Sequence, residues 1–119
     1  MGRVEGAREV IRQSVSGWEG VTVAPHRFGG IEFRLGKREL GHLHGDMLVD
    51  IPFPIKVREE LVAARKASPH HILPQSGWVS FEIGRDGSVA DAIALLRRSY
   101  ELAAEKQSEK RSRTDVKLD

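Results

Sequence analysis

The chain has 119 residues, a length that suits one domain and is too short for two of ordinary size. With 39% hydrophobic and 30% charged residues, its composition is typical of a globular protein in water. The absence of cysteine excludes disulfides, thiolate metal sites and thiol catalysis. No apolar run approaches the roughly 18 residues of a membrane span, and the N-terminal residues lack the apolar core of a signal peptide. We therefore expect a cytoplasmic protein with no membrane partner.

The first part of the chain alternates between helix and strand patterns. Residues 4–18 carry apolar side chains at helical spacing, and Gly17 and Gly20 mark the end of this predicted helix. Four β-rich segments follow, at residues 21–28, 31–35, 38–44 and 47–53. Glycine-containing turns separate them, which predicts a meander of about four antiparallel strands.

The second part predicts a helix, a strand and another helix. Residues 54–68 have an apolar stripe and begin at Pro54, a residue that suits a first helical turn. An irregular loop at 69–77 leads to a fifth strand at 78–84, in which apolar and polar residues alternate. The last helix has the clearest start, because Ser88 can cap it and Asp91 completes an acidic capping box.

The order of these elements is α-β-β-β-β-α-β-α. Runs of strands flanked by helices predict an α+β domain, in which an antiparallel sheet of about five strands has helices on one face. We assign residues 1–105 to this single domain. Residues 106–119 have almost no apolar content, and we expect them to form a polar, disordered C-terminal tail. An uncovered sheet face would be the place for a homodimer to form.

The stretch "RELGHLHGDMLVDIPFP" at residues 38–54 contains the best candidates for a site. His42 and His44 are two residues apart on a predicted strand, so they share a face. A two-residue turn would place His42 opposite Val49, among apolar neighbours. A three-residue turn would place it opposite Asp50 instead and create a histidine–aspartate pair. The sequence leaves both registers open, and half-buried structural histidines are the simpler interpretation.

A metal centre is the alternative interpretation of this stretch. "HLHGD" matches H-x-H-x-D, part of a metallo-β-lactamase ligand pattern, but Met47 follows where that family has a further histidine. The chain is also far too short for that fold, so we predict no metal, no cofactor and no catalytic residue. The candidate ligand-binding residues are His42, His44, Asp50, His70, His71 and Trp78. His70 and His71 are included because binding residues often lie on loops that a rigid sheet holds in place. The ring of Trp78 either stacks on a ligand or packs in the core.

Several quoted strings resemble one family. "ELGHLHGD", "DIPFP", "PHHILPQSGWVSFEI" and "ALLRRSYELA" together resemble a family of small bacterial and fungal domains labelled luciferase domain. The resemblance covers about residues 20–103 and implies no agreed catalytic residues and no established light-emitting chemistry. A narrower resemblance, from Trp78 to Tyr100, is to MmcQ/YjbR-like proteins, small α+β domains of which some have been proposed to bind DNA.

Three functions follow as hypotheses. The first is a non-catalytic module that binds a small molecule or a protein at the candidate residues. The second is a nucleic-acid-binding protein of MmcQ/YjbR-like type, which would use basic residues on the last two predicted helices, such as Arg58, Arg65, Lys66, Arg97 and Arg98. The small net charge of +2 gives this hypothesis little support. The third is a small enzyme with a histidine base, which requires a concave pocket and a strongly perturbed histidine.

Overall fold

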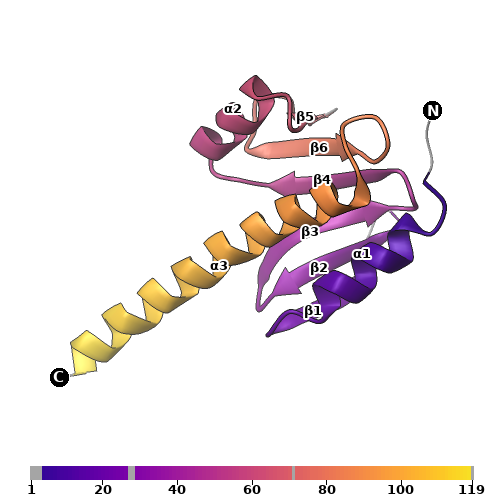
Figure 1. Cartoon of the computed structure of the whole chain (residues 1–119). Coiled ribbons are helices and arrows are strands. Elements are labelled where there is room, and N and C mark those ends of the chain that lie inside the picture. The colour runs from indigo at the N-terminus through magenta and orange to yellow at the C-terminus, as the bar shows by residue number, and fades with distance from the viewer. Residues whose placement is uncertain (1–3, 27–28, 71, 119) are drawn as a thin grey trace.

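A computed structural model describes residues 4–26, 29–70 and 72–118, except for the side chains of residues 112–118. Its elements are α1 (Ala7–Ser16), β1 (Val21–Pro25), β2 (Ile31–Leu35), β3 (Arg38–His44), β4 (Leu48–Pro52), α2 (Ile55–Ala63), β5 (Ser68–Pro69), β6 (Trp78–Glu82) and α3 (Val89–Leu118). The strands form one antiparallel sheet in the order β1-β2-β3-β4-β6-β5 (Figure 1). The predicted α+β class and the predicted order of elements are confirmed.

The described sheet has six strands where about five were predicted. The additional strand, β5, lies at Ser68–Pro69, where the second helix was expected to end, whereas α2 already ends at Ala63. The cause is a tight helix end. The amide of Lys66 donates to the carbonyl of Leu61 at 2.9 Å, and the amide of Arg65 donates to that of Val62 at 3.1 Å. This pair of bonds closes a Schellman motif and turns the chain back toward β6.

Arg65 occupies the left-handed position of this motif, with φ of 59°. Glycine is the usual residue there because any Cβ is strained in that conformation. We expect Arg65→Gly to raise the free energy of unfolding by about 0.5–1 kcal/mol, measured by urea unfolding with tryptophan fluorescence. Arg65→Ala, which keeps the strain, is the control and should bring no such gain. An equal gain in both variants would show that the arginine side chain, and not the backbone, is the source of strain.

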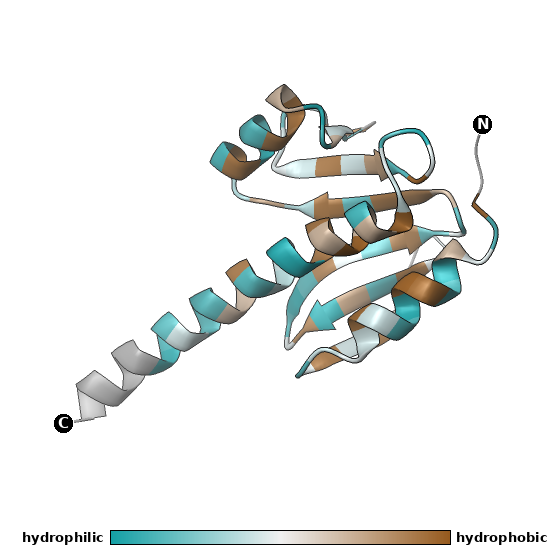
Figure 2. Ribbon diagram, in the orientation of Figure 1, coloured by the Kyte–Doolittle hydropathy of each residue, from teal (hydrophilic) through white to brown (hydrophobic). Residues whose placement is uncertain are grey.

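The two faces of the sheet differ in chemistry. One face is apolar and packs against α1 and α3, with Phe33, Leu43, Val49 and Phe81 buried at its centre. α2 lies beside β5 and β6 and adds Leu61 to the same core. The predicted placement of helices on one face is therefore correct. Figure 2 shows hydrophobic and hydrophilic bands alternating along the strands, as expected when the second face carries polar side chains.

Helix α3 begins with the predicted capping box. The amide of Ser88 donates to Asp91 Oδ2 at 2.9 Å, and the amide of Asp91 donates to Ser88 Oγ at 3.2 Å. Farther along, Ser99 Oγ donates to the carbonyl of Leu40, which fixes the helix on the sheet. The helix then continues to Leu118 and projects beyond the sheet (Figure 1). Residues 106–118, assigned above to a disordered tail, are therefore helical in the structure.

A β-bulge in β3 aims polar residues at the second face. Phe33 pairs with Gly41, but Arg34 pairs with Glu39, so Leu40 is the extra residue. In a regular strand, residues three apart point to opposite faces. The bulge cancels one step of this alternation, and Glu39 and His42 therefore contact each other on the same face.

Candidate functional site

The β3–β4 turn has three residues, so His42 pairs with Asp50 and His44 pairs with Leu48. Gly45 starts the turn with φ of 58°, and the amide of Met47 donates to the carbonyl of His44. Of the two registers left open by the sequence, the structure therefore adopts the one that sets a histidine against an aspartate. The same pairing continues outward, and one row of polar residues crosses four strands: Glu32, His42, Asp50 and Ser80.

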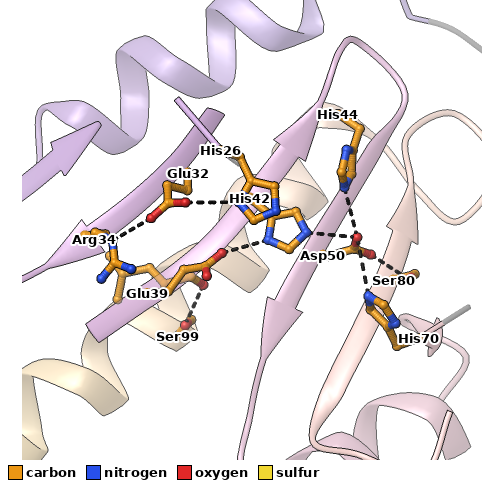
Figure 3. Close-up of polar contacts among 11 residues, drawn as sticks. His26, Glu32, Arg34, Glu39, His42, His44, Asp50, His70, Ser80 and Ser99 are labelled. Carbon is orange, nitrogen blue, oxygen red and sulfur yellow. Dashed lines mark hydrogen bonds and ion pairs between the residues drawn. The ribbon is translucent and has the colours of Figure 1, made fainter. Parts of the chain in front are cut away.

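Asp50 is the central acceptor of this row. Its side chain is fully buried. Oδ2 lies 3.2 Å from Nε2 of His42, 3.2 Å from Nε2 of His44 and 3.5 Å from Nε2 of His70 (Figure 3). Oδ1 accepts a hydrogen bond of 2.6 Å from Ser80 Oγ. Burial raises the pKa of Asp50, but the hydrogen bonds from His42 and Ser80 outweigh it and lower the pKa to about 2.

His42 lies between two carboxylates. Its Nε2 faces Asp50, and its Nδ1 lies 2.7 Å from Oε2 of Glu39. Burial lowers the pKa of His42, but the hydrogen bonds to Asp50 and Glu39 outweigh it and raise the pKa to about 9. In the unliganded protein at neutral pH, this ring is therefore an imidazolium that donates from both nitrogens.

A second histidine ring lies parallel to His42. The rings of His26 and His42 stack with centroids 4.0 Å apart and an angle of 12° between their planes. His26 comes from the end of β1 and lies 3.0 Å, through Nδ1, from Glu32, which also binds Arg34 (Figure 3). The hydrogen bond from His26 lowers the pKa of Glu32. This chain of contacts extends the polar row from β2 to the residue that follows β1.

Trp78 and His44 form the periphery of the site. The Trp78 ring contacts His42 and His70, with centroids 5.3 and 6.0 Å away. The side chain of His44 is 34% exposed, whereas that of Asp50 is 1% exposed. His44 is therefore the most exposed of the three histidines around the buried carboxylate.

The structure brings together five of the six predicted site residues: His42, His44, Asp50, His70 and Trp78. The sixth, His71, lies outside the described residues. We call the five residues, together with His26, Glu32, Glu39 and Ser80, the histidine cluster.

Sequence reasoning missed four members of the cluster. His26 follows Pro25 at a strand end, and nothing in its neighbours indicates a site. Ser80 occupies a polar position in the predicted alternation of residues 78–84, and Glu32 alternates with the buried apolar residues of β2, but the cross-strand partners of both were unknown. Glu39 was missed because in a regular strand its side chain would lie on the opposite face of the sheet from that of His42. The signal that could have found it is Gly41, since an isolated glycine in a strand indicates a bulge.

The predicted basic surface is largely engaged within the protein. A guanidinium nitrogen of Arg58 donates to the carbonyl of Pro74. Arg98 pairs with Glu60 at 3.4 Å, and Arg97 pairs with Glu101 at 3.1 Å. Nucleic-acid binding remains a prediction that these contacts do not favour. Among the helices that the structure describes, none combines the length and apolarity needed to cross a bilayer.

Comparison with known proteins gives one match. The family model described as Luciferase domain matches residues 37–99. These residues are more than half of the chain and include β3, β4, α2, β5, β6 and the start of α3. They also include Glu39, His42, His44, Asp50, His70 and Ser80. No curated protein and no solved structure matches the chain. The resemblance to the luciferase domain is confirmed, and the chain belongs to the luciferase-domain family.

Proposed function

We propose that this domain is a non-catalytic module that binds a small ligand at the histidine cluster. The observation that carries the proposal is the convergence of three imidazoles on the fully buried carboxylate of Asp50. They come from β3 and from the loop after β5, so the fold has assembled them from distant parts of the chain. The exposed side of His44 is where a ligand can enter, and the Trp78 ring offers a flat surface against which the ligand can pack.

A purely structural role explains this arrangement less well. Burial of ionised groups carries a large desolvation cost, and apolar residues of similar volume often give equal or greater stability. The same strands already supply a complete apolar core on their other face. The fold therefore has no need of a second, ionised core, whereas a binding site requires preorganised polar groups.

Catalysis by a histidine base is supported less. A general base must present a lone pair to its substrate. Both ring nitrogens of His42 are directed at carboxylates, so this ring has no lone pair to offer in the unliganded protein.

The two tryptophans of the chain provide a direct test. Trp78 flanks the cluster, while Trp18 packs against Tyr100 on the helical side and serves as an internal control. The protein is labelled with 5-fluorotryptophan, and ¹⁹F spectra are recorded with sodium acetate, sodium phosphate, magnesium chloride and zinc chloride, each added separately. We expect at least one probe to shift the Trp78 signal saturably and to leave the Trp18 signal in place.

The exposed histidine provides the matched variant. His44→Gln should remove the shift without changing the amide spectrum elsewhere, because His44 lies at the accessible edge of the cluster. If none of the four probes shifts the Trp78 signal at millimolar concentration, or if only Trp18 responds, the histidine cluster is not a binding site of this kind.

A further inference from the structure

We infer that the ligand of the histidine cluster is a divalent transition-metal ion, held by Nε2 of His42, Nε2 of His44 and Oδ2 of Asp50. The inference rests on the proposed function and names its ligand. One potential ligand atom from each of these residues lies within 4.8 Å of the other two. Both Nε2 atoms are 3.2 Å from Oδ2.

These separations match what one ion requires. Zinc binds nitrogen and oxygen ligands at about 2.0–2.2 Å, so neighbouring ligand atoms in a tetrahedral site are roughly 3.3–3.6 Å apart. Both nitrogen–oxygen separations lie within a few tenths of an ångström of this range. The ion would replace the proton that lies between Nε2 of His42 and Oδ2 of Asp50, so its binding releases protons.

In two of the three proposed ligands, the polar atom that does not face the ion already has a hydrogen-bond partner. Glu39 accepts from Nδ1 of His42 at 2.7 Å, which fixes the proton on Nδ1 and aims Nε2 at the site. Ser80 donates to Oδ1 of Asp50 at 2.6 Å and leaves Oδ2 to face the histidines. Carboxylate and hydroxyl partners of this kind orient the ligands of metal sites.

His70 is close to the same carboxylate oxygen but is not a ligand. Its Nδ1 accepts hydrogen bonds from the amides of Ile72 and Leu73, both at 3.1 Å. The neutral ring therefore carries its proton on Nε2, the nitrogen that faces Asp50. Nε2 therefore carries a proton 3.5 Å from Oδ2 of Asp50 and has no lone pair for an ion, so His70 is a positioning residue.

A second trio, of His26, Glu39 and His42, is also close enough to hold an ion. The stacking of His26 on His42 argues against it. The lone pair of an imidazole nitrogen lies in the ring plane, so two stacked, nearly parallel rings hold their lone pairs in two separate planes that do not meet at one ion. His42 and His44 are instead nearly perpendicular, at 89°, and both direct Nε2 at the same oxygen atom.

The donor set selects the class of metal. Two imidazoles and one carboxylate suit Zn²⁺, Co²⁺, Ni²⁺ or Cu²⁺, whereas Mg²⁺ and Ca²⁺ prefer oxygen donors alone. We therefore expect zinc and cobalt to bind in preference to magnesium.

The test uses the full chain without a histidine tag, stripped with EDTA and dialysed. Isothermal titration in two buffers of different ionisation enthalpy measures the affinity, the stoichiometry and the protons released, and Co²⁺ absorption reports the ligand geometry. We expect one Zn²⁺ per chain with proton release, and no saturable binding of Mg²⁺ at the same concentration. His44→Gln should weaken Zn²⁺ binding on the order of 100-fold or more, and Glu39→Gln by about 10-fold.

Two further histidine variants distinguish the ligands. His70→Gln should weaken Zn²⁺ binding by less than about tenfold and keep the Co²⁺ spectrum, since no ligand is lost. His26→Gln should behave in the same way. A large loss in His26→Gln with none in His44→Gln would move the ion to the second trio and overturn the inference. If acetate or phosphate shifts the Trp78 signal while zinc does not bind, the inference fails and the proposed function stands. If no probe binds, both fail.

Discussion

Asp50→Ala is expected to lower the free energy of unfolding of the metal-free protein by about 3–5 kcal/mol near pH 6, because removal of one partner of a buried ion pair leaves the remaining charge only partly compensated. In the variant, the His42 imidazolium keeps only Glu39, and the Ser80 hydroxyl loses the carboxylate to which it donates. Urea unfolding in EDTA, followed by tryptophan fluorescence, measures the loss.

The size of this loss should depend on pH in a defined direction. The pKa of His42 is raised from its ordinary value of 6.5 to about 9, so its contribution is complete below pH 6.5 and is lost as the pH rises through 9. The pKa of Asp50 is lowered from 3.8 to about 2, so its contribution is present above pH 3.8 and is lost as the pH falls toward 2. The difference between wild type and Asp50→Ala should therefore be largest between about pH 4 and 6.5, and smaller at pH 10.

Ser80→Ala is the matched control, because it removes one hydrogen bond to the same carboxylate but no charge. It should cost about 1–3 kcal/mol, with no decrease between pH 6 and pH 10. Equal losses for Asp50→Ala at these two pH values would contradict the ionic description of the His42–Asp50 pair.

The elements of this fold follow from local patterns, whereas its site depends on long-range pairing. The capping box at Ser88 and the alternation in residues 31–35 are read directly from neighbouring residues, and both are present in the structure. The position of His42 relative to Asp50 depends on the length of one turn, and a change of one residue exchanges the two faces of a strand. The residues of the turn did not determine whether it has two or three residues.

Two other features required the folded chain. The bulge at Leu40 rotates Glu39 onto the face of His42, and only the uneven pairing with β2 reveals it. The tautomer of His70 depends on the amides of Ile72 and Leu73, so its role as a donor follows from loop geometry. The sequence therefore identified most of the side chains in the cluster, and the structure supplied the hydrogen-bond directions that distinguish ligands from positioning residues.

Gly77→Ala is expected to lower the free energy of unfolding by about 3 kcal/mol or more, although the sequence places this glycine in an irregular loop. A Cβ on Gly77 would lie 2.0 Å from the carbonyl oxygen of Phe53. The amide of Phe53 donates to the carbonyl of Gly77 at 3.0 Å, next to the pair formed by Pro52 and Trp78. Neither backbone segment can therefore move away from the added Cβ without breaking the hydrogen bonds at this end of the β4–β6 ladder.

Gly45→Ala separates this clash from the ordinary cost of replacing a glycine. Gly45 has φ of 58° but open space around its Cβ position, so alanine there should cost only about 1–2 kcal/mol. Urea unfolding of both variants measures the difference, and ¹⁹F spectra locate the damage. Gly77→Ala should displace the Trp78 signal, because the strain falls on the first residue of β6, whereas Gly45→Ala should leave it in place. Equal costs in the two variants would mean that the close approach to Phe53 relaxes without opening the ladder. They would also mean that the backbone contact at the start of β6 is not what holds Trp78 against the histidine cluster.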